Sequence, residues 1–413
     1  MVSLSRPQWA GQLSMWHDMN QVRACESMGF LKRHIKSLVL SDVYPLVYRR
    51  ACAAPVVPSK VVFVEVRGSS LSDNFRLVHE RLREGGRHDI SVHFLGESSA
   101  SYPEYFRNCI AMLKDIATAR YVFLDDACNV IGSIPLRDGT KVVQLWHACG
   151  AFKKWGMSTA DLLFGGNRES KLKHPHYGNL SLVTISSSEV AWAYIEAMHL
   201  ESMPEIVKPL GVSRTDVYFD RNFLATAREQ VEDKIPVAHG KKIMLYAPTF
   251  RGRVASASAP TKLDIALLMR ELGGQYVLLV KQHPFVKNRP PVPDECKGFA
   301  FDVSDDFPID VLMAASDLCI SDYSSLIFEY SLLSRPMAFF AFDKAEYDDW
   351  RGFYYDYDEL TPGPVFTATE EIAAWVQSVS TSFDSAEVDA FRAKFMSACD
   401  GHATDRILEE VFD

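Results

Sequence analysis

The chain has 413 residues, of which 47% are apolar and 23% are charged, a composition typical of a globular protein with about two or three domains. The net charge of −9 excludes a global basic surface for nucleic acid, and no apolar run approaches the ~18 residues that a membrane-spanning helix needs. Eight cysteines without a CxxC pair, and a start that lacks the pattern of a secretory signal, are typical of a reduced cytoplasmic protein.

The first residues differ from the rest of the chain in charge. Residues 1–60 carry eight Lys or Arg against three Asp or Glu, whereas the remaining 353 residues carry 36 against 50. A helix is predicted here, with an apolar stripe of Leu31, Ile35, Leu38 and Val39 and a basic flank of Lys32, Arg33 and Lys36. This basic helical segment, residues 1–57, either lies on an anionic membrane surface or packs on the body of the protein as an ordinary amphipathic helix.

Strands and helices are predicted to alternate through the first half of the chain. The strands are 60–66, 89–96, 121–126, 141–148, 180–188 and 205–211, and the helices between them are 74–84, 106–119 and 191–200. Short, continuous apolar runs that alternate with helical periods are typical of a parallel sheet with helices on both faces. We expect this domain to span residues 58–212.

The same pattern begins again after residue 240. Its strands are 241–249, 276–284, 318–325 and 335–342, and its helices are 261–272, 307–316 and 326–334. We expect a second domain over 240–385, followed by a C-terminal helix over 386–413. The predicted fold class is therefore α/β, with two Rossmann-like, doubly wound domains and a cleft between them in which ligands bind.

Three basic side chains directly follow predicted strands. They are His147 in QLWHACG, Arg251 in YAPTFRG and His283 in VKQHPF. Ligands of parallel sheets bind outside the carboxyl ends of the strands, so all three are candidate site residues. A histidine can act as a base near neutral pH, and an arginine can hold a diphosphate through two hydrogen bonds. Each of them alone is equally compatible with an ordinary loop residue.

The segment SDYSSLIFEY places two hydroxyl groups at the start of a predicted helix. Ser324 is a candidate N-cap, and Ser325 and Glu329 share one helix face because they are four residues apart. A hydroxyl for a phosphate and a carboxylate for a ribose diol would suit a nucleotide. The alternative is a serine-capped helix with a solvated glutamate.

Motifs for a metal or a phosphate-binding loop are missing from the sequence. It contains no HExxH, GxxxxGK[ST] or GxGxxG, and acidic pairs such as 125–126 are common in loops. We expect neither a metal nor a cofactor.

Four stretches together resemble the CDP-glycerol glycerophosphotransferase family. They are WHACGAFKKWG, YAPTFRG, KQHP and SDYSSLIFEYSLLSRP, in the family's order and spacing. This family builds teichoic acids and related capsule polymers. The resemblance covers residues 58–385 and implies a GT-B architecture with the active site between two Rossmann-like halves, in agreement with the strand pattern.

The resemblance also implies roles for single residues. His147 matches the histidine proposed to activate the acceptor hydroxyl, and His283 matches the histidine at the donor diphosphate. The other matches are Arg251, Thr249, Ser324 and Ser325 at the donor diphosphate, Glu329 and Asp322 at the ribose or nucleotide, and Lys153 and Lys154 on the acceptor side. The loop after His147 departs from the family pattern, which leaves the identity of the acceptor open.

The implied reaction moves a polyol phosphate, first of all glycerol phosphate, from a CDP-activated donor to a hydroxyl group and releases CMP. The acceptor would be a lipid-linked saccharide or a growing polymer, and the enzyme would be cytoplasmic and held at the inner face of the membrane, with a homo-oligomer compatible with the sequence. Three alternatives stay open: a CDP-ribitol donor, a sugar-nucleotide glycosyltransferase of the same architecture, and a non-catalytic assembly protein. The two intact histidines argue against the last.

Overall fold

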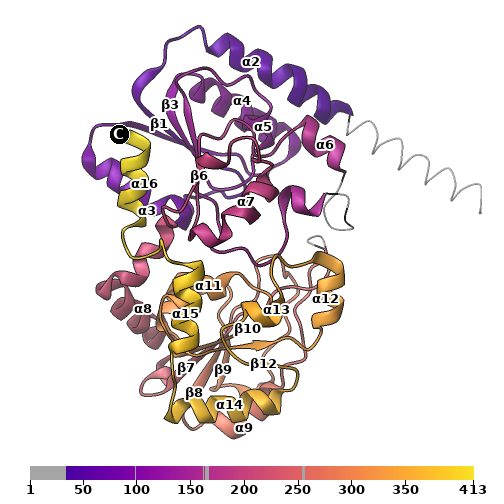
Figure 1. Ribbon diagram of the computed structural model, residues 1–413. Coiled ribbons are helices and arrows are strands. Elements are labelled where there is room, and N and C mark those ends of the chain that lie inside the picture. The colour runs from indigo at the N-terminus through magenta and orange to yellow at the C-terminus, as the bar shows by residue number, and fades with distance from the viewer. Residues whose placement is uncertain (1–33, 98, 161, 163–166, 254–255) are drawn as a thin grey trace, which may run out of the picture.

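Two parallel sheets, one in each half of the molecule, form the framework of the protein (Figure 1). The computed structural model describes residues 34–413 except 98, 161, 163–166 and 254–255. Each sheet has six strands, in the orders β2-β1-β3-β4-β5-β6 and β12-β11-β10-β7-β8-β9. The prediction of two parallel α/β halves is therefore confirmed.

The first half contains six strands and the helices that cover them. The strands are β1 (Val57–Glu65), β2 (Asp89–Phe94), β3 (Ala119–Leu124), β4 (Lys141–Gln144), β5 (Leu182–Thr184) and β6 (Val207–Lys208). The helices are α2 (Tyr44–Ala51), α3 (Asp73–Gly85), α4 (Tyr102–Ile116), α5 (Asn129–Gly132), α6 (Arg168–Lys173) and α7 (Ala191–Met198).

The second half repeats this arrangement. Its strands are β7 (Lys242–Tyr246), β8 (Tyr276–Val280), β9 (Ala300–Asp302), β10 (Leu318–Ser321), β11 (Met337–Phe340) and β12 (Val365–Phe366). Its helices are α8 (Arg221–Lys234), α9 (Ile265–Leu272), α10 (Ile309–Ala315), α11 (Leu326–Ser331), α12 (Lys344–Arg351), α13 (Tyr357–Leu360) and α14 (Thr369–Thr381). The helices α15 (Ala386–Phe395) and α16 (Ala403–Phe412) follow.

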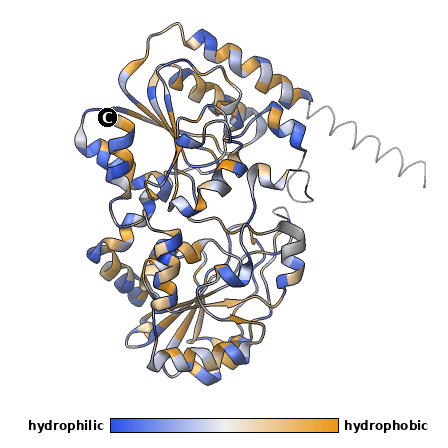
Figure 2. Ribbon diagram, viewed as in Figure 1, coloured by the Kyte–Doolittle hydropathy of each residue, from blue (hydrophilic) through white to orange (hydrophobic). Residues whose placement is uncertain are grey.

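Strand β1 shows why these strands are continuous apolar runs in the sequence. Val61 and Phe63 belong to one buried cluster, and Val62 and Val64 belong to another on the opposite face of the sheet. Because helices cover both faces, successive side chains are buried in both directions. Figure 2 accordingly shows the strands as mostly apolar, whereas the helices carry hydrophilic residues on their outer sides.

The sequence pattern does not predict β9 or β12. Both are only two or three residues long, and both are edge strands of the second sheet. An edge strand is covered on fewer sides, so it does not need a long apolar run. The predicted joint between the halves, near 210–240, contains the additional helix α8.

Residues 386–413 form two helices rather than the single helix that we expect from the sequence. The chain has to leave the second half and return to the first, where Ile407 and Val411 of α16 join the cluster around β1. The two crossing segments pack closely at Gly211, which has a φ of 90°. A Cβ atom there would lie 2.3 Å from the main-chain oxygen of Ala398.

Residues 34–51, which include α2, form a helix that we call the N-terminal helix. It packs on the body of the protein, as one of the two alternatives predicts. Leu40, Tyr44 and Tyr48 are buried, and the rings of Tyr44 and Phe106 of α4 stack with centroids 5.7 Å apart. In the first turns, Ile35 and Leu38 of the predicted stripe are exposed. The other stripe residue before them, Leu31, and its neighbours Lys32 and Arg33 lie outside the described residues.

Within the described ranges, no helix is long and apolar enough to cross a membrane.

The buried face of this helix generates a stability prediction. Tyr48 is fully buried and its hydroxyl accepts a hydrogen bond of 3.2 Å from the main-chain N–H of Arg137. Replacing Tyr48 with Ala removes a large buried ring, so we expect the free energy of unfolding to fall by about 3–5 kcal/mol. The control Leu46→Ala, on the exposed side of the same helix, should change it by less than about 0.5 kcal/mol. Denaturant titration of both variants measures this, and equal effects would contradict the packing.

Candidate active site

Strained backbone presents His147 at the end of β4. The chain reaches it through Trp146, whose φ of 60° lies in the left-handed region that bulky residues rarely adopt. The Trp146 ring stacks on Trp155 with centroids 4.4 Å apart, and its centroid lies 4.1 Å from that of the His147 ring. Packing therefore fixes a conformation of a kind that is found most often at functional sites.

The surroundings of His147 keep its ring neutral, with the lone pair on Nε2. Its Nδ1 lies 3.3 Å from the main-chain oxygen of Asp125, and because a carbonyl oxygen only accepts, Nδ1 must carry the proton. Although 41% of the side chain is exposed, the surrounding protein removes enough water to lower the pKa of His147 below its ordinary value. A neutral imidazole with its lone pair on Nε2 is the form that a general base requires.

The structure places an acidic cluster beside His147 that the sequence analysis does not predict. Asp126 Oδ2 lies 3.7 Å from His147 Nδ1 and 2.5 Å from Arg67 Nε. Burial and the neighbouring Glu65 raise the pKa of Asp125 to about 8, so Asp125 retains its proton at neutral pH. The signal in the sequence is the acidic pair directly after the strand YVFL, at the same sheet edge as His147.

His283 has the opposite arrangement of ring nitrogens. It follows β8, and its Nδ1 accepts a hydrogen bond of 3.2 Å from the main-chain N–H of Phe285. In the neutral ring Nε2 therefore carries the proton. Phe250 and Phe285 fix the ring, with centroid distances of 4.8 and 4.7 Å. His283 thus presents an N–H donor, which suits a phosphate oxygen.

Carboxylates surround Arg251. Its Nε and Nη2 donate to the two oxygens of Asp343 at 2.5 and 3.0 Å, and its Nη1 donates to Asp322 at 2.9 Å and to the main-chain oxygen of Thr249 at 2.7 Å. The guanidinium also lies 5.1 Å from the centroid of the Tyr323 ring. Protein groups use most of its donors, and two carboxylates exceed its charge. In this structure Arg251 thus holds carboxylates of two loops, and its contact with a donor diphosphate stays a prediction.

Thr249 and Asp322 belong to the same buried cluster. The hydroxyl and the main-chain N–H of Thr249 both donate to Asp322 Oδ1, the latter at 2.8 Å. Asp322 also accepts from the main-chain N–H of Tyr323 at 2.6 Å. Both side chains are almost fully buried and hold the loop together, and their contact with a donor stays a prediction.

Ser324 and Ser325 follow this cluster and remain partly exposed. Ser324 Oγ accepts a hydrogen bond of 3.4 Å from the main-chain N–H of Leu326, the first residue of α11. Helix α11 has only six residues, so its dipole is small. The groups of this turn that can bind an anion are therefore its hydroxyl and main-chain N–H groups. The rigid Arg251 cluster fixes their position.

Glu329 faces the first half of the molecule and not an open surface. Its Oε1 lies 2.5 Å from Arg214 Nε and accepts from Cys149 Sγ at 3.8 Å. Burial raises the pKa of Glu329, whereas Arg214 opposes this rise. Its carboxylate is thus occupied by a contact between the halves, so the expected contact with a ribose would require breaking a buried ion pair.

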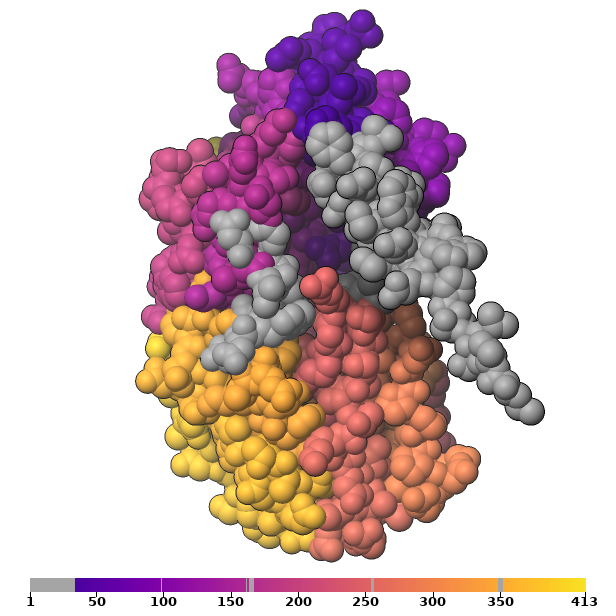
Figure 3. All heavy atoms as spheres, turned by 90° about the vertical axis from the view of Figure 1, so that its right-hand side faces the viewer, coloured from indigo at the N-terminus to yellow at the C-terminus, as the bar shows by residue number. Residues whose placement is uncertain are grey.

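The loop of Lys153 and Lys154 joins the two halves. Lys153 forms an antiparallel bridge with Phe353, and the main-chain N–H of Lys154 donates to Gly352 at 3.1 Å. Lys153 Nζ also lies 3.5 Å from the Tyr347 hydroxyl. The segments that follow β4 and β11 therefore meet at this junction. Figure 3 shows the surface hollowed where the two halves meet.

The contacts sort the predicted residues other than His283, which packs against Phe250, into three groups. His147 lies with the acidic cluster of the first half. Arg251, Thr249 and Asp322 form one buried cluster of the second half, next to the two serines. Glu329 and the two lysines belong to the junction. In the part of the chain that the structure describes, no group of three or more His, Cys, Asp or Glu could hold a metal ion.

Comparison with curated proteins finds teichoic acid enzymes. A teichoic acid ribitol-phosphate primase of Bacillus spizizenii is 32% identical over 388 residues, which are 92% of this chain and 97% of the primase. A teichoic acid poly(ribitol-phosphate) polymerase of the same species is 33% identical over 86% of this chain, but the match covers only 56% of that polymerase. A teichoic acid glycerol-phosphate primase of Bacillus subtilis is 29% identical over 72% of this chain.

Comparison with solved structures supports the architecture. The wall teichoic acid polymerase TagF superposes with a TM-score of 0.73 at 22% identity, over 95% of this chain and 97% of that one. A UDP-GlcNAc 2-epimerase of Neisseria meningitidis superposes with a TM-score of 0.54 at 14% identity, over 85% and 99%. The expected GT-B-like fold is confirmed.

A family model covers almost the whole described chain. It matches residues 46–413 and describes a CDP-glycerol:poly(glycerophosphate) glycerophosphotransferase. The match begins inside α2 and continues through both sheets to the end of α16. It includes the loops that carry His147, His283 and the two serines. The chain belongs to the CDP-glycerol:poly(glycerophosphate) glycerophosphotransferase family.

Proposed function

We propose that this protein transfers a polyol phosphate from a CDP-polyol to a hydroxyl group during teichoic acid synthesis. The observation that carries this proposal is the opposite proton placement of two histidines on the two halves. His147 offers a lone pair on Nε2, and His283 offers an N–H on Nε2. A transfer between an acceptor hydroxyl and a diphosphate needs one group of each kind.

The chemical step balances with these two groups. The acceptor oxygen forms a bond to the phosphorus that carries the polyol, while the bond from this phosphorus to the bridging oxygen breaks. His147 Nε2 takes the proton of the hydroxyl, and CMP leaves with the bridging oxygen. His283 Nε2–H and the hydroxyl groups of Ser324 and Ser325 stabilise the charge on the phosphate oxygens, because charge-assisted hydrogen bonds strengthen as charge develops.

The donor polyol is glycerol or ribitol. Relatives named for ribitol phosphate are 32–33% identical to the chain. Those named for glycerol phosphate are 26–32% identical. A TagF structure comes from a crystal soaked with CDPG, which supports a CDP-polyol in this fold.

A panel of donors tests the function. CDP-glycerol, CDP-ribitol and UDP-sugars are incubated with the protein and a membrane fraction as the acceptor source, and the released nucleotide is identified. CMP from one CDP-polyol is the expected result. Release of UDP would instead favour the alternative, a glycosyltransferase of the same architecture, and release of no nucleotide would favour a non-catalytic role.

The acceptor is proposed to be a lipid-linked saccharide or a growing polymer at the inner face of the membrane. Exposed Ile35 and Leu38 at the start of the N-terminal helix support contact with a lipid surface. The double variant Ile35→Gln/Leu38→Gln should co-sediment less with anionic vesicles than the unmodified protein, at an unchanged melting temperature. Equal sedimentation would contradict this role for the helix. Deletion of residues 1–57 is a poorer test, since it removes the buried Tyr48.

Loss of the base should slow the chemical step. We expect His147→Ala to lower kcat by about 10²–10⁴-fold, while the affinity for the CDP donor stays close to normal. His239→Ala is the matched control, because this histidine is exposed, lies beside α8 outside both the site and its cavities, and pairs with Glu232 at 3.3 Å. Turnover assays and donor titration measure both effects. Near-normal turnover of His147→Ala would exclude it as the base.

The acid limb of the kcat–pH profile should report His147. Burial lowers the pKa of His147, and the neutral form is the active one, so the acid limb of kcat should lie at a lower pH than an ordinary histidine would give. Asp126 favours the protonated ring, so Asp126→Asn should move the acid limb to still lower pH and also reduce the plateau, because the base is weaker. A limb that moves to higher pH would contradict the assignment.

Variants of Arg251 and Ser324 should distinguish a residue that stabilises the fold from one that only binds the donor. Arg251→Lys keeps the charge but cannot reach both carboxylates, so we expect a lower melting temperature together with weaker donor binding. Ser324→Ala should weaken donor binding by about ten-fold with an unchanged melting temperature. Calorimetric donor titration and thermal melts of both variants measure this. A normal melting temperature for Arg251→Lys would show that the arginine is not structural.

A further inference from the structure

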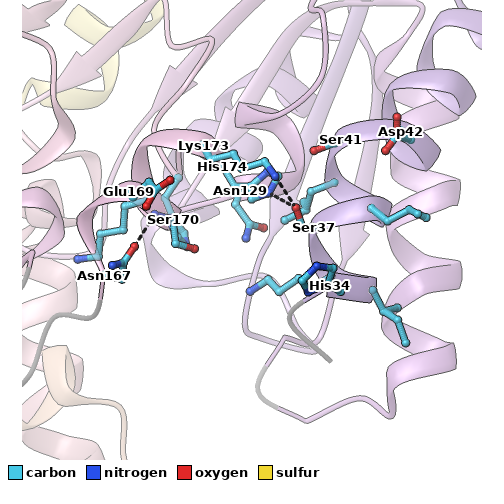
Figure 4. A pocket seen from close by; sticks show the side chains of 16 residues that line it. His34, Ser37, Ser41, Asp42, Asn129, Asn167, Glu169, Ser170, Lys173 and His174 are labelled. Carbon is cyan, nitrogen blue, oxygen red and sulfur yellow. Dashed lines mark hydrogen bonds between the residues drawn. The ribbon is translucent and has the colours of Figure 1, made fainter. Parts of the chain in front are cut away.

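A cavity of about 1050 Å³ opens between the N-terminal helix and α6 (Figure 4). His34 and Ser37 line it from the helix, and Asn167 and Ser170 line it from the other side. At one end, Lys173 Nζ and His174 Nε2 each lie 3.0 Å from Ser37 Oγ and connect the two walls. This volume is at the upper end of the range of ligand-binding pockets.

The lining of this cavity is cationic. Its basic and titratable members are Lys36, Lys171, Lys173, His34, His174 and His176, against the carboxylates of Asp42 and Glu169, which Figure 4 shows at opposite edges. Burial together with Lys173 and Lys36 lowers the pKa of His174. Burial together with Lys36 and Lys171 lowers the pKa of His176 to about 4. The lysines thus repel further positive charge, and a bound anion would relieve this repulsion.

A second, smaller cavity adjoins this one. It has a volume of about 240 Å³, shares Lys171 and His176 with the first, and is also lined by Arg67. Arg67 pairs with Asp126, whose carboxylate lies 3.7 Å from His147 Nδ1. The second cavity therefore lies next to the ion pair that backs His147.

The chemistry of the lining favours a flexible anionic chain over a nucleotide. None of the described residues that line the larger cavity is Phe, Tyr or Trp, the side chains on which a nucleotide base usually stacks. Lysines, serines and asparagines instead suit phosphate oxygens and hydroxyl groups. The cavity also belongs to the half opposite to the two serines, where the donor is proposed to bind.

We propose that this cavity binds a phosphodiester of the polyol-phosphate acceptor, with Lys36 and Lys173 as its principal contacts. A phosphate held there would orient the chain along the second cavity, so that its terminal hydroxyl reaches His147. The identity of the anion rests on the proposed function, whereas the cationic character of the cavity does not.

Direct binding tests this site without the reaction. The full chain is titrated with synthetic tri(glycerol phosphate) in a calorimeter, with no donor present. Lys36→Gln/Lys173→Gln should weaken binding by at least about ten-fold, and added salt should weaken the binding of the unmodified protein. Lys262→Gln/Lys297→Gln, which removes the same charge from exposed positions of the second half, should leave it unchanged. Ser37→Ala removes the connection between the walls without a change of charge and should cost much less than the double lysine variant.

Each contrary outcome identifies its own cause. Equal affinity of Lys36→Gln/Lys173→Gln and the unmodified protein would overturn the site, and so would an equal loss in Ser37→Ala. Binding of phosphatidylglycerol vesicles, lost in the lysine variant, without binding of tri(glycerol phosphate) would show a lipid headgroup site and overturn the acceptor assignment. CMP release from a CDP-polyol with an unchanged KM for the acceptor in the lysine variant would overturn this site alone and leave the proposed function intact.

Discussion

The ion cluster of Arg251 with Asp322 and Asp343 is the constraint on which the second half depends. Its three members come from the loops that follow β7, β10 and β11, three adjacent strands of one sheet. A buried guanidinium is stable only when its partners satisfy it fully, and two carboxylates and a carbonyl oxygen do so here. The turn that carries Ser324 starts directly at this cluster. A surface arginine could not hold three loops in one geometry.

The two histidines gain their proton placement from the main chain and not from other side chains. A carbonyl oxygen at Asp125 and an N–H at Phe285 cannot exchange roles, so each ring has one neutral tautomer that fits. The acid–base polarity of the site is therefore a property of the fold. The buried pair of Arg214 and Glu329 adds a fixed contact between the halves that carry these rings.

The sequence predicts the architecture well because nearly every central strand is buried on both faces and must be a continuous apolar run. It fails at β9 and β12, where edge strands of two or three residues leave no such run. It also finds the residues at strand ends, such as His147 and His283. The sequence does not predict which side chains pair with one another, because the partners are far apart along the chain. Arg251 contacts Asp343 across 92 residues, and Glu329 contacts Cys149 across 180. From its residue type, Arg251 is predicted to bind a diphosphate, whereas in the structure it contacts two carboxylates.

The position of α16 has a consequence for co-translational folding. Ile407 and Val411 complete a cluster with Val61 and Phe63, which are made some 340 residues earlier. At the ribosomal rate of ~5–20 residues per second, that face of the first sheet stays only partly covered, by α3, for tens of seconds. The sheet of the second half does not need α16, so the second half can fold while the first half is still incomplete. The half that is made first is therefore finished last, and during synthesis it exposes the surface that chaperones recognise.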